Sequence, residues 1–166
     1  LNGSKMLWLG KFDPKMSANG VGGAQFAEVE VDVETGVVKV KKIVAIQDSG
    51  LIIDKLTWAS QVSGGVIGGL NYGMFEERVM DPKTGTMLNA DLENYKLARA
   101  SDIPEIVVKA YEPDEIKARG VIGVGEPPTI ATAAAIANAV ANAVGVRVPN
   151  LPLSPKNVLD ALKGKA

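Results

Sequence analysis

Five glycines within one predicted helix, Gly64, Gly65, Gly68, Gly69 and Gly73, constrain this chain more than any other feature. The helix is predicted over about residues 57–77, with Asp54 or Thr57 as its cap. Each interior glycine costs about 1 kcal/mol of helix propensity, so tertiary packing must compensate. Because glycines four residues apart share one helix face, that face would be flat and free of side chains. Close packing of the helix on a sheet is the favoured interpretation, and direct contact with a flat ligand is the alternative.

Strands are predicted on both sides of this helix. Residues 24–33 alternate between apolar and charged side chains from Val29 onward, and residues 37–47 carry lysines after a turn at 34–36. This period of two predicts a hairpin with one buried and one solvated face, in which an acidic strand lies against a basic one. Other short strands are predicted at residues 7–9, 78–80, 86–88, 105–111 and 146–148. Those at 78–80 and 86–88 would form a second hairpin around a turn at 81–85.

An alanine-rich helix is predicted to begin near residue 130 and to end at Gly145. Its apolar face would consist of Ile130, Ala134, Ala137, Ala141 and Val144. A last helix is predicted over residues 156–162, because Ser154-Pro155 suits a helix start. Strands and helices are mixed without strict alternation. The predicted class is therefore α+β, with sheet hairpins, a glycine-rich helix and an alanine-rich helix.

The composition excludes several kinds of chemistry. The 166 residues include no His and no Cys, which removes thiol catalysis, histidine relays, and zinc, iron–sulfur or haem sites built from those residues. With 18 basic and 19 acidic residues and a net charge of −1, the chain has no basic field for nucleic acid. No apolar span is long enough to cross a bilayer, and neither a Rossmann nor a P-loop motif occurs. The length suits one domain with its own core.

The strongest candidate for chemistry is Glu126, in the sequence GVGEPP at residues 123–128. The two glycines before it allow the backbone to approach a bulky group closely, and the two prolines after it suit a helix entrance. A glutamate at a helix entrance is usually a cap or a partner of the helix dipole. The residue pattern alone therefore favours a cap over a catalytic base.

Several longer segments are informative together. They are GGAQFAEVEVDVETG, QDSGLIIDKLTWASQVSGGVIGGLNYGMFEE, LENYKLARASDIPE, GVGEPPTIATAAAIANAV and RVPNLPLSPKNVLDAL. In this order and spacing, from about residue 22 to residue 162, the chain resembles the C-terminal molybdenum-cofactor-binding region of the xanthine dehydrogenase and aldehyde oxidoreductase family. The resemblance implies a molybdopterin-binding α+β domain.

The resemblance also implies roles for particular residues. Glu126 matches the family's catalytic glutamate, the base toward a hydroxide on the molybdenum, and Gln61 matches a glutamine that approaches the cofactor. Val124 and Gly125 match residues whose backbone comes close to the metal. In this family the molybdenum is held through a pterin dithiolene, so no side chain of this chain is expected to ligate it. Ser60 stands where many members have glycine.

Cofactors, partners and a reaction follow from the same resemblance. The expected cofactor is molybdenum-molybdopterin, in its simple or dinucleotide form, with iron–sulfur clusters and FAD on partner domains or subunits. The rest of the molybdenum subunit would complete the site for a small-molecule substrate. Gln47-Asp48-Ser49-Gly50, where many relatives have His-Asp-x-Gly, is similar to the bacterial aldehyde-oxidising branch. Oxidation of an aldehyde to a carboxylic acid with water as the oxygen source is therefore expected. Purine or N-heterocycle hydroxylation, or a non-catalytic binding or assembly module, are the alternatives.

The same resemblance implies a division of the chain into domains. Residues 1–20 would be a linker or the continuation of an upstream domain, and residues 21–166 the cofactor-binding domain. The expected compartment is the cytoplasm, or the periplasm if a partner subunit carries the export signal.

Overall fold

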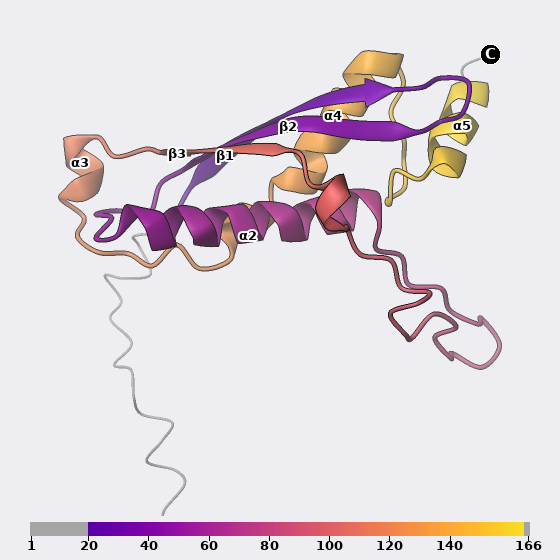
Figure 1. Cartoon of the computed structure of the whole chain (residues 1–166), viewed down its shortest axis with the longest axis horizontal. Coiled ribbons are helices and arrows are strands. Elements are labelled where there is room, and N and C mark those ends of the chain that lie inside the picture. The colour runs from indigo at the N-terminus through magenta and orange to yellow at the C-terminus, as the bar shows by residue number, and fades with distance from the viewer. Residues whose placement is uncertain (1–19, 165–166) are drawn as a thin grey trace, which may run out of the picture.

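The computed structural model describes residues 20–164, which form a three-stranded sheet with two long helices on one face (Figure 1). The strand order is β1-β2-β3, with β1 at Gly23–Val31, β2 at Val38–Gln47 and β3 at Glu105–Ala110. The predicted α+β class is confirmed. The strand predicted at residues 7–9 lies outside the described residues.

The first two strands form the predicted antiparallel hairpin. β1 ends at Val31, two residues earlier than predicted, because Asp32 begins the turn: its N–H donates to Val37 and its carbonyl accepts from Gly36. A β-bulge interrupts the register between Glu28 and Val29. Glu30 pairs with Lys41 at 3.4 Å on the solvated face, as the charge pattern predicted.

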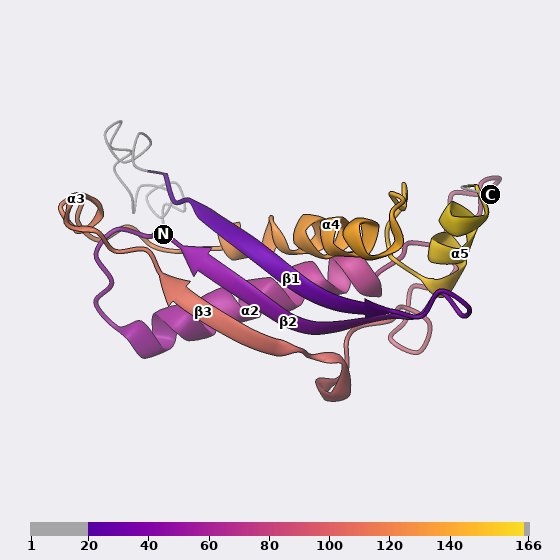
Figure 2. The same cartoon turned by 90° about the horizontal axis from the view of Figure 1, so that it is seen from above.

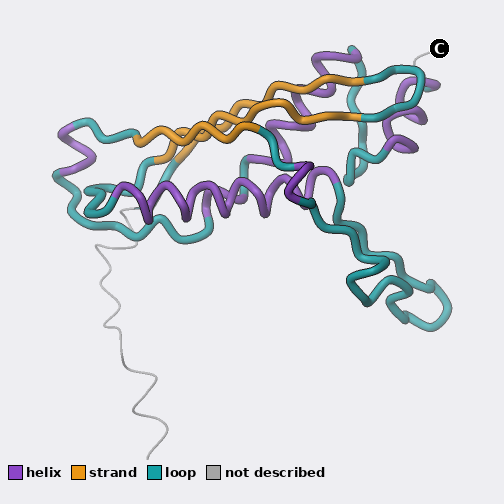
Figure 3. Tube along the Cα trace, in the orientation of Figure 1, coloured by secondary structure: helices purple, strands orange, loops and turns teal. Residues whose placement is uncertain are grey.

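The third strand adds to the sheet in parallel with β2, so that Ile43 lies beside Ile106 and Ala45 beside Val108. A parallel neighbour needs a long crossover connection. Here the connection carries α2, at Lys55–Met74, and an irregular segment that ends in the short helix η2, at Ala100–Asp102. Figure 3 shows that this irregular segment projects away from the body of the fold.

The core lies between the sheet and the helices α2 and α4, the latter at Thr132–Val144 (Figure 2). Ile43 and Ala45 of β2, Val66 and Leu70 of α2, and Ile136 of α4 are at most 1% exposed and belong to one cluster. Burying side chains of this size contributes about 1.5–3 kcal/mol each. Two layers around one core follow from these contacts.

The glycine face of α2 packs against another helix and not against the sheet, which corrects the favoured interpretation. A Cβ at Gly65 would lie 2.8 Å from Cβ of Pro128, and one at Gly69 would lie 2.5 Å from the carbonyl oxygen of Thr129. Pro128 and Thr129 belong to the short helix η3, at Pro127–Thr129, which leads into α4. Only residues without a side chain allow α2 to approach η3 and α4 this closely.

The buried face of α4 also differs from the prediction. Thr132, Ile136 and Val140 are buried, whereas Ile130 is 78% exposed and lies before the helix begins. A run of alanines does not define which side of the helix is buried, because all its side chains are small. The larger Ile136 and Val140 determine the buried side. Gly145 ends the helix in the left-handed conformation, as predicted.

The remaining elements are short. Of the predicted second hairpin, only a turn and one bridge between Met80 and Met87 form. No strand forms at 146–148, and the short helix α3, at Asp114–Lys117, follows β3. The last helix, α5 at Pro155–Lys163, is capped by Ser154 as predicted. Among residues 20–164 no helix is both long enough and apolar enough to cross a membrane.

Candidate functional site

Two residues named from the sequence, 64 positions apart, meet in the structure. The side-chain amide nitrogen of Gln61, in the first half of α2, donates a hydrogen bond of 2.8 Å to the carbonyl oxygen of Gly125. Helix α2 begins where predicted to within two residues, because the Asp54 carboxylate accepts the N–H groups of Leu56 and Thr57. This cap fixes the helix end from which Gln61 projects.

The backbone around Gly125 is exposed and takes a conformation that glycine favours. Gly125 has φ +58°, in the left-handed region, and a Cβ built on Gly123 would meet nothing within 4 Å. The side chain of Val124 packs against the core cluster. The segment 123–125 is therefore anchored by one side chain between two exposed glycines.

Glu126 follows directly and is not a helix cap. Its carboxylate is exposed and makes no hydrogen bond or ion pair with any residue in the range 20–164. An N-cap side chain bonds to the N–H of the second or third helical residue. Pro128, the second, has no N–H, and the N–H of Thr129, the third, already donates to the backbone carbonyl of Glu126. The predicted side-chain cap is therefore wrong.

The chain just after Glu126 is held on its other side. The carbonyl oxygen of Pro128 accepts from the side-chain amide of Gln25 on β1, and the hydroxyl of Thr132 donates to the same Gln25 side chain. Thr132 is fully buried. Glu126 thus lies between two residues whose carbonyl oxygens are hydrogen-bonded: Gly125, bonded to Gln61 of α2, and Pro128, bonded to Gln25 of β1. Sequence reasoning missed Gln25, since nothing local distinguishes it from a solvated strand residue.

The groups that this site offers suit an organic cofactor. In the described part of the chain, the N–H groups of Val124, Gly125 and Glu126 donate to no acceptor. Gln61 retains its amide oxygen and a second amide hydrogen. A hollow of about 240 Å³ lies beside them, between the start of α2 and the segment Val121–Val124. Residues 20–164 contain no group of three His, Cys, Asp or Glu side chains that could hold a metal ion. Amide donors match the ring nitrogens and oxygens of a pterin.

The residues of the QDSG sequence do not face this hollow as a group. Gln47 is 3% exposed and its amide donates to the carbonyls of Gly22 and Asp48. Ser49 is 2% exposed and accepts the indole N–H of Trp58 at 2.6 Å. Gln47 is thus used within the fold and gives no physical support to a substrate preference.

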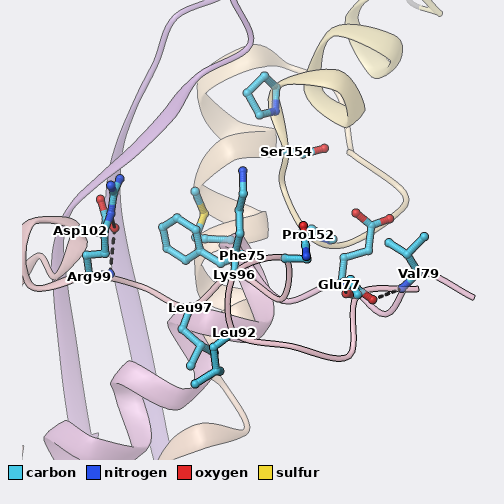
Figure 4. Close-up of a pocket in the computed structure, with 14 residues that line it drawn as sticks. Phe75, Glu77, Val79, Leu92, Lys96, Leu97, Arg99, Asp102, Pro152 and Ser154 are labelled. Carbon is cyan, nitrogen blue, oxygen red and sulfur yellow. Dashed lines mark hydrogen bonds and ion pairs between the residues drawn. The ribbon is translucent and has the colours of Figure 1, made fainter. Parts of the chain in front are cut away.

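A second pocket, of about 650 Å³, lies at the other end of α2 (Figure 4). Phe75, Lys96 and Pro152 are among the residues that line it, and Arg99 pairs with Asp102 at its edge. None of the predicted site residues lines this pocket.

Comparison with known proteins agrees with the resemblance. Residues 9–104 match the family described as molybdopterin cofactor-binding domain. The chain is 38% identical over 141 residues to a putative xanthine dehydrogenase molybdenum-binding subunit of Escherichia coli, covering 83% of this chain and 18% of that protein. It is 37% identical over 142 residues to the aldehyde oxidoreductase molybdenum-binding subunit of the same organism, covering 82% of this chain and 19% of that protein.

A solved structure has the same fold. The aldehyde oxidoreductase from Desulfovibrio gigas superposes with a TM-score of 0.75 at 32% identity, covering 86% of this chain and 15% of that one. The chain spans less than a fifth of the length of the relatives that it matches. A xanthine dehydrogenase and an aldehyde oxidoreductase subunit are about equally similar to it, so the comparisons do not resolve the substrate.

Proposed function

Since the chain belongs to the molybdopterin cofactor-binding domain family of the molybdenum hydroxylases, we propose that it forms one wall of a molybdenum-cofactor site in which Glu126 is the catalytic base. The observation that carries this proposal is the Gln61–Gly125 hydrogen bond, which brings a candidate cofactor contact beside an exposed carboxylate with no partner among residues 20–164. A carboxylate that neither caps a helix nor pairs with a cation is available to accept a proton.

The roles of the other residues follow from their positions. Gln61 would hydrogen-bond to the cofactor through its remaining amide groups, and the N–H groups of Val124 and Gly125, which have no acceptor among residues 20–164, would do the same. When bound, the molybdenum cofactor supplies the two-electron redox chemistry of the hydroxylation. The chain's own part is to orient the cofactor and to hold Glu126 where it can take and release a proton.

The proposed reaction is oxidation of an aldehyde to a carboxylic acid with water as the oxygen source, on the resemblance to the aldehyde-oxidising branch. Hydroxylation of a purine or another N-heterocycle is the second candidate, supported by the 38% identity to a xanthine dehydrogenase subunit as the 37% identity to an aldehyde oxidoreductase subunit supports the first. The proposed domain spans residues 21–166. Electrons would leave through iron–sulfur clusters and FAD on partner domains or subunits.

Replacing Glu126 by Gln in the complete enzyme tests the proposal. A general base contributes roughly 10²–10⁴-fold, so kcat should fall by about that factor on whichever substrate the enzyme turns over. Molybdenum and pterin contents, measured on the same preparation, should stay at the wild-type level. Glu115→Gln is a matched control, because Glu115 is another exposed carboxylate on the short helix α3. Normal turnover by Glu126→Gln would overturn the assignment.

Gln61→Met tests the cofactor contact separately, because methionine has a similar length and no amide. We expect a lower pterin content per enzyme, measured after acid release of the pterin. Wild-type pterin content together with wild-type turnover would argue against a role for Gln61.

A further inference from the structure

We infer that the turn formed by residues 47–50, here called the 47–50 turn, is a positioning element that fixes Gln61 and Glu126 relative to one another, with the Asp48–Arg119 ion pair as its central contact. This inference rests on the proposed function of those two residues. Neither Asp48 nor Arg119 belongs to the candidate site itself. Their role is to set the course of the two chain segments that deliver it.

The carboxylate of Asp48 joins two segments that are 71 residues apart. One oxygen accepts the N–H of Gly50 at 2.9 Å, within the turn, and the other accepts the Arg119 guanidinium at 2.7 Å. The side chains of Asp48 and Arg119 are only 15% and 22% exposed. Exposed ion pairs contribute little because water screens them, whereas this pair is largely shielded. The guanidinium also donates to the carbonyl of Gly20.

Backbone contacts continue the same junction toward Glu126. The N–H of Leu51 donates to the carbonyl of Gly120 at 2.8 Å, and Gly50 forms an antiparallel bridge with Val121. Gly50 has φ +70°, and a Cβ there would collide with the Gly120 carbonyl oxygen. The chain from Arg119 to Val121 is therefore held against the turn before it runs on to Glu126.

The turn is tied to helix α2 as well. The hydroxyl of Ser49 accepts the indole N–H of Trp58 at 2.6 Å, and Ser49 is buried. Trp58 lies three residues before Gln61, on the same side of the helix. The turn thus contacts the helix one turn ahead of the residue that the site uses.

These contacts connect the turn to the candidate site by two routes. The first is the Ser49–Trp58 hydrogen bond and the stretch of α2 from Trp58 to Gln61. The second is the Asp48–Arg119 pair and the chain from Arg119 to Gly125, which the Gln61–Gly125 hydrogen bond joins to the first. If the Asp48–Arg119 contact is lost, only the backbone contacts at Gly120 and Val121 still hold the segment from Arg119 to Gly125 against the turn, so this segment is less firmly placed while Gln61 stays where it is. A misplacement of about 1 Å can cost roughly 10²-fold in rate.

The test uses the complete enzyme with Asp48→Asn, Arg119→Gln and the double variant. We expect each single variant to lower kcat by roughly 10- to 100-fold, with little change in KM and with wild-type molybdenum and pterin contents. The double variant should be no worse than either single one, because both remove the same contact. Arg119→Lys, which keeps the cation, should recover part of the loss.

Hydrogen exchange measured by mass spectrometry gives a second readout that does not depend on turnover. In Arg119→Gln, the peptide that carries the Leu51 amide, which donates to the Gly120 carbonyl across the junction, should exchange faster, while peptides covering β1 and β2 should be unchanged. Glu105→Gln is the matched control, because it breaks the Lys42–Glu105 pair of 3.0 Å on the sheet. This control should change neither turnover nor exchange at Leu51.

Two results would overturn the inference. One is unchanged exchange of the Leu51 amide in Arg119→Gln. The other is a uniform rise across β1 and β2 with a kcat per molybdenum equal to wild type, which would make the pair a general stabiliser only. Failure of the proposed function is seen separately, as normal turnover by Glu126→Gln.

Discussion

Replacing Gly64 and replacing Gly69 of α2 by alanine should change the stability of the helix in opposite directions. A Cβ at Gly69 would lie 2.5 Å from the carbonyl oxygen of Thr129 and 2.5 Å from Cβ of Thr132. A Cβ at Gly64, five residues earlier on the same helix, would meet nothing within 4 Å. Gly64→Ala and Gly69→Ala therefore make the same chemical change in different surroundings.

The expected magnitudes follow from these surroundings. Each replacement raises helix propensity by about 1 kcal/mol, and nothing opposes this gain at Gly64. At Gly69 the new methyl group lies about 1 Å inside the ordinary contact distance of about 3.5 Å. Thr129 offers backbone and Thr132 is fully buried, so neither can move without moving α4. Overpacking of this kind costs about 1–3 kcal/mol, and the propensity gain offsets about 1 kcal/mol of it, so we expect a net loss of up to about 2 kcal/mol.

Hydrogen exchange of the α2 and α4 amides in the complete protein measures this difference, because it reports the free energy of local opening. Gly64→Ala should slow exchange in α2 roughly fivefold, and Gly69→Ala should accelerate it by up to about 30-fold. Equal responses, or slower exchange in Gly69→Ala, would refute the conclusion that the glycine face exists for close helix packing.

Two further predictions concern the ends of α2. Asp54→Ala should destabilise the first turn of α2 by about 1 kcal/mol, which hydrogen exchange would report as faster exchange there. Asp54→Asn should leave the turn nearly unchanged, because asparagine also caps. Equal effects of the two variants would contradict the cap. The Tyr95 hydroxyl donates to the Glu76 carboxylate at 2.6 Å, and this hydrogen bond raises the pKa of Tyr95 above its ordinary value. The contribution of this bond to stability is present below the ordinary tyrosine pKa and is lost as pH rises through the raised value. In a difference absorbance titration against Tyr95→Phe, the Tyr95 phenolate should therefore form at a higher pH than for an ordinary tyrosine. In Glu76→Gln the phenolate should form at a lower pH than in the wild type. An unshifted titration in Glu76→Gln would count against the interaction.

Local pattern predicted most of the secondary structure and failed at identifiable places. The hairpin of β1 and β2 was predicted because alternation of side chains has a period that only a strand provides. The second hairpin was reduced to the single Met80–Met87 bridge, since few apolar side chains there can be buried. The face of α4 was wrong at Ile130, because alanines alone define no direction in the helix.

The candidate site was partly accessible from sequence. Gln61, Val124, Gly125 and Glu126 were named through a resemblance, and the structure joins Gln61 to Gly125 and packs Val124 on the core. Whether Glu126 acts as a base stays a prediction. The absence of a side-chain cap at Glu126 could not be read from the two prolines after it, because Thr129, the third helical residue, keeps an N–H that a cap could use. In the structure that N–H donates to the backbone carbonyl of Glu126 instead.

The sequence by itself determined the hairpin, the start of α2 near Asp54 or Thr57, and the existence of one glycine-lined helix face that packs closely against another part of the protein. These features depend on the period of side chains and on single residues, which act over a few positions. Only the tertiary structure decided what approaches that face, that Gln61 meets Gly125, and that Asp48 meets Arg119. Those contacts join residues more than 60 positions apart, and no local periodicity carries that information, because it depends on how the whole chain packs around one core.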